Sequence, residues 1–421
     1  MSNDHPMAII GNGGAAIAAV RALRDSGYGG AIRLITDYSS PAYNPVLLSY
    51  YVAGKINRQQ CFPYGYDWAF YREHNIELIT GSPVVALDCL EHEIVTGNGE
   101  RITYDKCLVA SGARPIVLPI PGIDSTKIHC LRTLEDADRL KAALELGPQK
   151  VLVVGSSMVG FKMVEVCLQL GIKVSLADIT EHVLPRSAHV ECAKVIESWL
   201  TEQGVELLLN KAMFQVNHED SEAASVHFKS AAKDDPKDES TESHHFDLIV
   251  FCVGVKANTD FINPSQIHVD QGILVDTKMR TSNSDVYAAG DVAQAHNLQT
   301  GQPEIIGLWS NALYQGRTAG RNMAGRYDTL PGSIPHNIIS IQNMHFASVG
   351  YTQACSAEAL KIYEQDGARA YLAYCDTHLE GTNLYGNIES AGILKQAIVG
   401  QRDGVSVPLF VSKSGTLTPS L

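Results

Sequence analysis

The chain has 421 residues, of which 45% are hydrophobic and 19% charged, and its formal net charge is −13 at pH 7. This length predicts two or three globular domains, and no uninterrupted apolar run reaches the roughly 18 residues that a membrane span needs. The negative charge argues against a nucleic-acid partner, because phosphate binding needs a concentrated basic surface. Since no apolar signal region precedes Met7, a cytoplasmic location is the expectation.

The first predicted element is a buried strand at residues 7–10, followed directly by a glycine-rich turn and an alanine-rich helix. The turn has the G-x-G-x-x-A pattern of a dinucleotide-binding fold, with Gly11, Gly13 and Ala16 at its fixed positions. Gly11 permits the tight turn, Gly13 lets a pyrophosphate approach the backbone, and the small Ala16 lets helix and strand pack closely. Asp37 follows the next strand and could accept hydrogen bonds from ribose hydroxyls, unless it is an ordinary turn aspartate.

The same order of strand, turn, helix and strand recurs from residue 151, so the chain is expected to carry two nucleotide folds. The second turn runs from Gly155 to Gly160, and the strand after its helix ends near Asp178. Ser157 replaces the middle glycine, where a pyrophosphate normally needs close approach to the backbone. Asp178 favours NAD over NADP, because a carboxylate accepts the free 2′-hydroxyl of the ribose and repels a 2′-phosphate.

The remaining segments carry less chemistry. Between His218 and His245 the chain is polar and charged, and we expect a long solvent-exposed hairpin loop there. From about Pro331, strand-like runs such as 346–351 and 368–374 predict a third, smaller α+β domain. The nine cysteines include no C-x-x-C pair, so no zinc or iron–sulfur site is predicted and buried, reduced thiols are expected.

Four further stretches are more specific: YDKCLVASGARP at 104–115, FCVGVKAN at 251–258, TSNSDVYAAGDV at 281–292 and WSNALYQGRTAGRNMAG at 309–325. Together they resemble the FAD-dependent pyridine nucleotide oxidoreductases. In that family the first two stretches are the crossing segments between domains, the third is the second FAD motif, and the fourth is the helix after it.

The resemblance implies an α/β fold with two Rossmann-like dinucleotide-binding domains and a small C-terminal α+β domain. The FAD domain is discontinuous and the NAD domain is inserted into it. The implied boundaries are 1–121 with 247–330 for the FAD domain, 122–246 for the NAD(P) domain, and 331–421 for a C-terminal interface domain through which the chain could form homo- or hetero-oligomers.

The turn patterns and the resemblance together give a set of candidate binding residues. For FAD they are Gly11, Gly13, Gly14, Ala15, Ala16, Asp37, Asn44, Ser111, Gly112, Arg114, Gly290, Asp291, Trp309 and Ala312. For NAD they are Gly155, Ser156, Ser157, Val159, Gly160, Asp178 and Gly254.

Within the FAD set, Asp291 carries the most specific expectation. The Asp291 carboxylate is expected to accept a hydrogen bond from a ribityl hydroxyl, and a structural role as a helix N-cap before Val292 is compatible with the same position. The N-terminus of the helix that begins near Trp309 would favour an anionic reduced flavin.

The sequence departs from the family at several places. Besides Ser157, the chain has Lys162 where the family often has a glutamate near the nicotinamide, and a lysine there could still contact a carboxamide or phosphate. Asn44 is followed by Pro45, Val46 and Leu47 rather than by the reactive cysteine of the family's disulfide reductases, and the paired His-Glu signature of those enzymes is missing. A thiol mechanism is therefore rejected, and no side chain is assigned as a catalytic acid or base.

The chain is most similar to flavin subunits or domains that serve iron–sulfur proteins, such as ferredoxin and rubredoxin reductases and the flavin part of nitrite reductase. The resemblance implies an FAD oxidoreductase that passes electrons between NAD(H) and an iron–sulfur protein or partner subunit, by hydride transfer to or from flavin N5. Such a chain could be the flavin subunit of a larger complex, for example with a molybdenum or tungsten aldehyde oxidoreductase or in a nitrite reductase-like assembly. Two alternatives stay open: an FAD-bearing relay or structural subunit with a degenerate nicotinamide site, and a stand-alone NADH oxidase.

Overall fold

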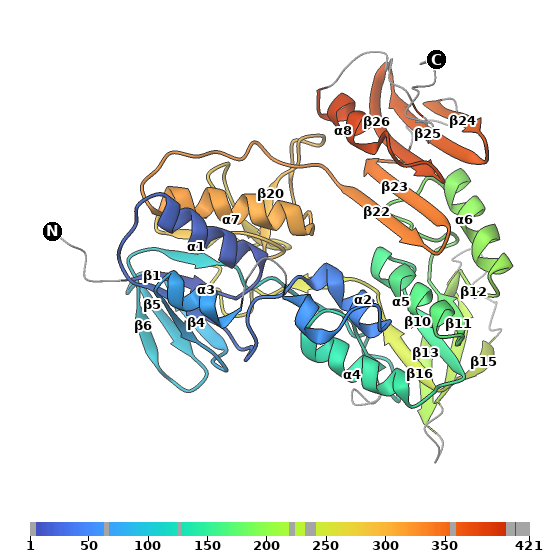
Figure 1. Cartoon of the computed structure of the whole chain (residues 1–421), viewed down its shortest axis with the longest axis horizontal. Coiled ribbons are helices and arrows are strands. Elements are labelled where there is room, and N and C mark those ends of the chain that lie inside the picture. Colours follow the sequence, from blue (N-terminus) through green and yellow to red (C-terminus); the bar gives the residue numbers. More distant parts are fainter. Residues whose placement is uncertain are drawn as a thin grey trace. The chain divides into compact units, whose positions relative to one another are not determined.

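The computed structural model describes residues 6–62, 67–123, 128–218, 224–231, 241–353, 359–400 and 409. The chain divides into two units. Unit 1 comprises Met1–Leu48, Ile56–Arg114 and Val255–Ser333, and unit 2 comprises Ser49–Lys55, Pro115–Gly254 and Ile334–Leu421. Each unit is thus assembled from segments that lie far apart in the sequence (Figure 1).

Unit 1 is built on a parallel five-stranded sheet in the order β19-β7-β1-β2-β3. Its strands are β1 (Met7–Ile10), β2 (Ile32–Ile35), β3 (Ile76–Ile79), β7 (Cys107–Val109) and β19 (Val286–Ala288). Helix α1 (Gly14–Asp25) follows β1 and packs side by side with α7 (Trp309–Met323), as Figure 1 shows. The close packing depends on glycine, because a Cβ at Gly316 or Gly320 would clash with the carbonyl oxygens of Ala15 and Ala19.

Smaller elements complete unit 1. The strands β4 (Val84–Asp88), β5 (Glu93–Thr96) and β6 (Arg101–Thr103) form an antiparallel sheet, and β18 (Ile273–Leu274), β20 (Ala293–His296) and β21 (Pro303–Glu304) form another small sheet. Strand β8 (Ala113–Pro115) pairs with β17 (Val255–Ala257). Short helices lie at η1 (Pro45–Leu47), η2 (Arg58–Cys61) and α3 (Trp68–Glu73).

Unit 2 contains a second parallel five-stranded sheet, in the order β12-β11-β10-β16-β9. Its strands are β9 (Ile128–His129), β10 (Lys150–Val154), β11 (Lys173–Ala177), β12 (Glu206–Leu208) and β16 (Leu248–Phe251), and its helices are α4 (Leu134–Glu145), α5 (Met158–Gln169) and α6 (Val190–Glu202). Most of the short helix α2 (Leu48–Val52) also belongs to this unit.

The expectation of one long exposed loop between His218 and His245 is wrong. This stretch contains β14 (Ala224–Ser230) and nearly all of β15 (Thr241–Phe246), which form an antiparallel sheet with β13 (Lys211–His218). From residue 226 to residue 229 the fully buried Val226 and Phe228, which belong to the core of unit 2, alternate with the partly buried His227 and the exposed Lys229. The period-2 burial of a strand was therefore masked by the charged residues around it.

The C-terminal region of unit 2 forms an antiparallel five-stranded sheet in the order β22-β23-β26-β25-β24, with α8 (Ala391–Val399) packed on β23 and β26. Its strands are β22 (His336–Ile341), β23 (Met344–Gly350), β24 (Leu360–Gln365), β25 (Ala368–Cys375) and β26 (His378–Tyr385). The two parallel sheets and this α+β region confirm the predicted fold class. The domain boundaries remain a prediction.

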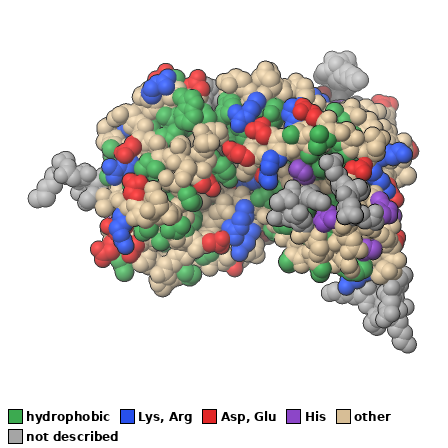
Figure 2. Space-filling model, turned by 90° about the horizontal axis from the view of Figure 1, so that it is seen from below, with side chains coloured by type: hydrophobic (Ala, Val, Ile, Leu, Met, Phe, Trp, Pro, Cys, Tyr) green, Lys and Arg blue, Asp and Glu red, His purple; other side chains and the backbone are tan. Residues whose placement is uncertain are grey.

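The surface and the helix lengths bear on the expected environment. In the described part of the chain, no helix is both long and apolar enough to cross a membrane. On the face drawn in Figure 2, Lys and Arg side chains are interspersed with Asp and Glu rather than gathered into one patch.

Candidate dinucleotide-binding sites

The first glycine turn has the geometry that a pyrophosphate requires. Gly11 has φ of +106° and its N–H donates to the carbonyl of Ile35 at 2.8 Å. A Cβ at Gly11 would clash with the Ala110 carbonyl, whereas a Cβ at Gly13 would meet no atom within 4 Å. Gly11 is therefore needed by the fold, and Gly13 leaves open space in front of the α1 N-terminus, where an anion is favoured.

A tyrosine that sequence reasoning missed holds the loop beside this turn. The Tyr71 hydroxyl donates to Asn12 Oδ1 at 2.8 Å and accepts from the Ala42 N–H at 2.9 Å. Burial raises the pKa of the Tyr71 phenol, so it stays a proton donor at neutral pH. Asn12 donates in turn to the Ser40 carbonyl, and the buried Ser40 hydroxyl has no partner among the described residues. An unpaired hydroxyl next to an open turn fits a site for a polar ligand.

The other residues of the first strand edge lie as follows. Asp37 is exposed just beyond β2, where its carboxylate is accessible to a ribose. Asn44 is buried, caps η1 through a hydrogen bond from the Val46 N–H, and donates its own N–H to the Cys61 carbonyl at 3.0 Å. Cys61 is thus near Asn44 in space, but its side chain is fully buried.

The crossing segment is locked by Asn258. Ser111 Oγ donates to the Asn258 carbonyl at 2.9 Å, and Asn258 Nδ2 donates to the Ser111 carbonyl at 2.9 Å. Arg114 donates to Asn258 Oδ1 at 3.1 Å and pairs with Asp260 at 2.7 Å. Gly112 has φ of +66° and accepts from the Asn258 N–H. These contacts give Ser111 and Arg114 a structural role within unit 1 in addition to the predicted one.

The second FAD motif meets the start of α7. Gly290 has φ of +82°, and its N–H donates to Gln315 Oε1 at 2.8 Å. Asp291 follows in a turn that leads into β20, so the alternative of a helix N-cap before Val292 is wrong. A Cβ at Gly307 would lie 3.5 Å from Asp291 Oδ1, which places the Gly307 backbone beside the carboxylate.

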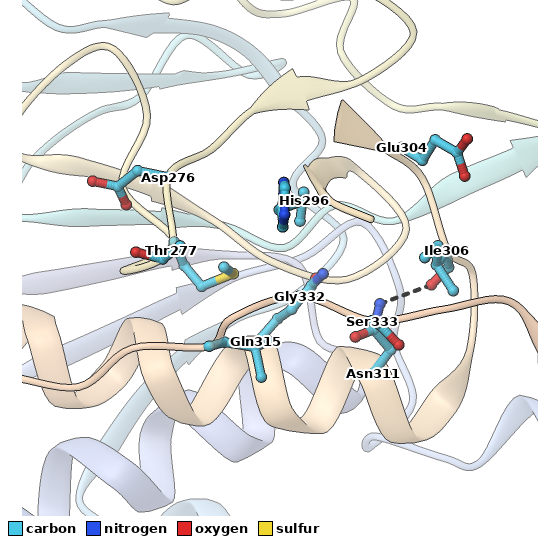
Figure 3. Close-up of a pocket in the computed structure, with 12 residues that line it drawn as sticks. Asp276, Thr277, His296, Glu304, Ile306, Asn311, Gln315, Gly332 and Ser333 are labelled. Carbon is cyan, nitrogen blue, oxygen red and sulfur yellow. Dashed lines mark hydrogen bonds between the residues drawn. The ribbon is translucent and has the colours of Figure 1, made fainter. Parts of the chain in front are cut away.

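The N-terminus of α7 lacks a side-chain cap, since Leu308 stands at the N-cap position. Trp309 begins the helix and its ring covers Gly14, where a Cβ would lie 2.8 Å from the ring, and the partly buried Ala312 lies one turn further on. Figure 3 shows Asn311 and Gln315 on the side of α7 that lines a pocket with Asp276 and His296. The uncapped N–H groups remain available for an anionic group.

The second turn has the same backbone conformation as the first, but a serine side chain stands at its middle position. Gly155 has φ of +104°, and a Cβ at Gly160 would clash with the Gly155 carbonyl, so both glycines are needed by the fold. Ser157 caps α5: its Oγ accepts from the Gly160 N–H at 3.3 Å and donates to the Cys252 carbonyl at 2.8 Å. The side chain thus occupies part of the turn that Gly13 leaves open in unit 1.

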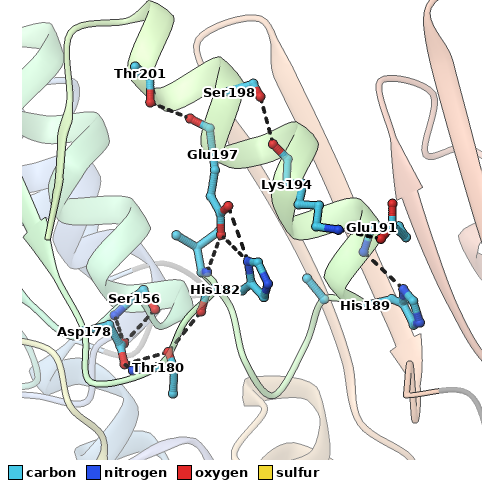
Figure 4. A network of polar contacts seen from close by, with 12 residues as sticks. Ser156, Asp178, Thr180, His182, His189, Glu191, Lys194, Glu197, Ser198 and Thr201 are labelled. Carbon is cyan, nitrogen blue, oxygen red and sulfur yellow. Dashed lines mark hydrogen bonds and ion pairs between the residues drawn. The ribbon is translucent and has the colours of Figure 1, made fainter. Parts of the chain in front are cut away.

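Asp178, at the end of the strand that follows the second turn, accepts two hydrogen bonds on each carboxylate oxygen (Figure 4). Asp178 Oδ2 accepts from the Ser156 N–H at 2.7 Å and the Ser156 hydroxyl at 2.6 Å, and Oδ1 accepts from the Thr180 N–H at 3.0 Å and the Thr180 hydroxyl at 2.8 Å. Val159 is 43% exposed on the first turn of α5, and the exposed Gly254 has φ of +116° after β16.

Lys162 belongs to a charged cluster within unit 2. Its Nζ lies 2.8 Å from Glu165 Oε2, 2.9 Å from the Ser340 carbonyl and 5.3 Å from the centre of the Tyr50 ring. Lys55 reaches Glu165 Oε1 at 3.0 Å and approaches the same ring. Burial alone would raise the pKa of Glu165, but hydrogen bonds and charge from Lys162 and Lys55 lower it. Lys162 is therefore held by its own unit.

Most thiols of the described residues are buried. Seven of the eight cysteines there are buried, and none forms a disulfide. Burial raises the pKa of the Cys130 thiol to about 11 and that of the Cys167 and Cys192 thiols to about 12. Cys355 lies outside the described residues. A nucleophilic thiolate at neutral pH is therefore disfavoured at these positions.

Sequence reasoning thus found both turns but missed Tyr71, Thr180, the hydrogen bond between Gln315 and Gly290, and the partners of Lys162. The spacing Gly316-x-x-x-Gly320 could have indicated the close packing of α7 on another helix. The residues of unit 1 fit a dinucleotide such as FAD, through the open space at Gly13 and the uncapped start of α7. The residues of unit 2 leave less space and fewer free acceptors for a dinucleotide, because Ser157 and Asp178 already make hydrogen bonds within the protein.

Comparison with known proteins gives a consistent result. A family model described as pyridine nucleotide-disulphide oxidoreductase matches residues 5–316. The chain is 29% identical, over 86% of its length, to an assimilatory nitrate reductase electron transfer subunit of Bacillus subtilis, of which it spans only 45%. It is 28% identical, over 94% of its length and 91% of the relative, to the NADH-dependent phenylglyoxylate dehydrogenase subunit epsilon of Aromatoleum evansii.

Solved structures share the fold. A NAD-dependent persulfide reductase from A. fulgidus superposes with a TM-score of 0.84 at 23% identity, covering 94% of this chain and 77% of the other. The covalent putidaredoxin reductase–putidaredoxin complex gives a TM-score of 0.85 at 22% identity, covering 96% of this chain and 97% of the other.

Proposed function

The chain belongs to the pyridine nucleotide-disulphide oxidoreductase family, and from that premise we propose that it binds FAD and passes electrons between NAD(H) and an external iron–sulfur protein or partner subunit. The observation that carries the proposal is that the chain has two dinucleotide-binding turns and that seven of the eight described cysteines are buried. Buried thiols do not favour a disulfide relay within the chain, which supports an external acceptor for the electrons of the flavin.

In this proposal, the residues of unit 1 hold FAD and those of unit 2 bind NAD(H). Gly13 and the α1 N-terminus would receive the FAD pyrophosphate, Asp37 its adenosine ribose and Asp291 a ribityl hydroxyl. Gly155, Gly160 and Asp178 would receive NAD(H). When bound, FAD supplies the chemistry that exchanges electron pairs with a nicotinamide and single electrons with an iron–sulfur centre.

The names of several relatives support an iron–sulfur partner. They include a rubredoxin-NAD(+) reductase and putidaredoxin reductase CamA, both of Pseudomonas putida, each 26% identical to this chain. Two relatives named as subunits support a place in a larger complex. The described residues contain no group of three or more His, Cys, Asp or Glu that could hold a metal ion, so we place the cluster on the partner. We place the C-terminal region, from residue 331, at the interface.

The test is an anaerobic titration of the FAD-loaded chain with NADH and, separately, NADPH, followed at the flavin absorbance maximum. About one equivalent of NADH should bleach the flavin, and NADPH should do so much more weakly. Adding oxidised rubredoxin or a [2Fe–2S] ferredoxin should then restore the absorbance. The proposal fails if dithionite bleaches the flavin but neither nucleotide does.

The saturated Asp178 and the filled turn at Ser157 favour a second candidate, an FAD-bearing relay whose nicotinamide site is degenerate. That candidate predicts no NADH bleaching at any concentration, and it requires protein partners as both donor and acceptor. A stand-alone NADH oxidase would instead consume oxygen steadily with NADH and no protein partner.

A further inference from the structure

Two buried amide side chains lie on one side of α7, at Asn311 and Gln315. They are 5% and 2% exposed, respectively. Residues four positions apart share one side of a helix, and Figure 3 shows both residues on the side of α7 that lines the pocket. Because a buried amide needs hydrogen-bond partners, the partners of this amide pair show which segments it holds.

Gln315 holds the residue that precedes Asp291. Its Oε1 accepts from the Gly290 N–H at 2.8 Å. Gly290 has φ of +82°, and a Cβ there would lie 3.3 Å from the Cβ of Ala15 on α1 and 3.7 Å from that of Ala312 on α7. The glycine therefore lies where the two helices meet, and its hydrogen bond to Gln315 holds the backbone that carries Asp291 against α7.

Asn311 holds a second segment beside the same carboxylate. Its Nδ2 donates to the Ile306 carbonyl at 3.0 Å, which Figure 3 draws as a dashed line. Gly307 follows directly, and a Cβ there would lie 3.5 Å from Asp291 Oδ1 and 3.8 Å from Oδ2. The amide pair thus ties two backbone segments next to Asp291 to a single helix, whose uncapped N-terminus is available for an anionic group.

We infer that the amide pair of α7 positions the Asp291 carboxylate for FAD, by holding the two backbone segments beside it. The inference rests on the proposed binding of FAD by unit 1, and neither amide needs to touch the cofactor. Without the acceptor on Gln315, the Gly290 N–H loses its hydrogen bond and the segment can shift in the apoprotein. FAD binding must then restore the position of Asp291, so the loss lowers the affinity for FAD.

The test measures the Kd for FAD of each apoprotein by fluorescence quenching. Gln315→Met keeps a similar volume and removes the acceptor, and it should raise the Kd about fivefold or more, as should Asn311→Leu. Asn322→Leu is the matched control on the same helix. Asn322 Nδ2 also donates to backbone carbonyls, those of Lys278 and Asp328, but near the other end of α7, and its loss should change the Kd by less than about twofold.

A double-mutant cycle with Asp291→Ala separates positioning from general loosening of the fold. If Gln315 acts through Asp291, adding Gln315→Met to Asp291→Ala should change the Kd for FAD by less than about twofold. General loosening would instead multiply the two losses. Urea unfolding shows which variants fold, and if Gln315→Met does not, Asn311→Leu carries the same cycle.

Three results would overturn the inference: folded amide variants that bind FAD as tightly as wild type, an equal loss of affinity in Asn322→Leu, or losses that multiply with Asp291→Ala. In each case the proposed function still stands as long as NADH bleaches the wild-type flavin. Conversely, a wild-type flavin that NADH does not bleach would refute the proposed electron transfer, while the FAD affinities of the variants would still decide the role of the amide pair.

Discussion

Replacing Gly13 with alanine separates binding from folding at the first turn. Gly13 has φ of −94° and ψ of −169°, an extended conformation that alanine adopts without strain, and its Cβ would meet no protein atom within 4 Å. The folding cost should stay within about 1 kcal/mol, from the poorer helix N-cap. The methyl group would nevertheless occupy the space left for a pyrophosphate, so FAD affinity should fall by at least roughly tenfold.

The control is Gly11→Ala at the same turn. There the Cβ would clash with the Ala110 carbonyl, and φ of +106° is unfavourable for alanine, so this variant should lose more than about 2 kcal/mol of stability. Urea unfolding of the apoprotein and quenching of FAD fluorescence measure the two quantities separately. If Gly13→Ala binds FAD as tightly as wild type while remaining folded, the assignment of the pyrophosphate to this turn is refuted.

Three other perturbations have defined outcomes. Glu165→Gln should cost about 2 kcal/mol at pH 7, because it leaves the ammonium groups of Lys162 and Lys55 without their carboxylate. Since the pKa of Glu165 is lowered in the fold, the difference from wild type in urea unfolding should be full at neutral pH and shrink as the pH falls through that lowered pKa; equal stability at pH 7 would contradict the cluster. Gly160→Ala should unfold unit 2 at lower urea because of the clash with Gly155, whether or not nucleotides are present, and unchanged unfolding would contradict the close helix–strand contact. Alkylation of the native protein with iodoacetamide should leave NADH bleaching of the flavin unchanged, and its loss would point to a thiol step.

Both parallel folds could be predicted because their signals are local. Gly11 and Gly155 each follow an apolar strand directly. Both have a positive φ, which glycine adopts readily, so the residue type itself indicates the turn. The partners of the site residues come from distant segments, which no local pattern reports. Tyr71 reaches Asn12 across 59 positions, and Asn258 reaches Ser111 across 147.

The prediction of a loop after His218 failed for a different reason. Its composition is that of a solvated loop, but Val226 and Phe228 on β14 face a core supplied by other strands. Tertiary burial of alternate residues decided the structure, and composition alone could not indicate it. Lys162 is a similar case: its local ion pair with Glu165 is visible in the sequence, but Lys55 and Tyr50, which contact the same two residues, come from another segment.

The contrast between the two turns gives a physical reason for two kinds of ligand in one chain. A resident cofactor must stay bound through many turnovers, which favours a turn whose free backbone and open space are realised only with the ligand present. Gly13 has that character. A substrate must leave after each turnover, and a site whose own groups compete for the same acceptors shortens its residence. Ser157 fills part of the second turn, so we expect a dinucleotide to be held there less tightly than at the first turn. Ser157→Gly should therefore slow NAD⁺ release in stopped-flow measurements while leaving FAD retention unchanged, and an unchanged release rate would contradict this role of Ser157.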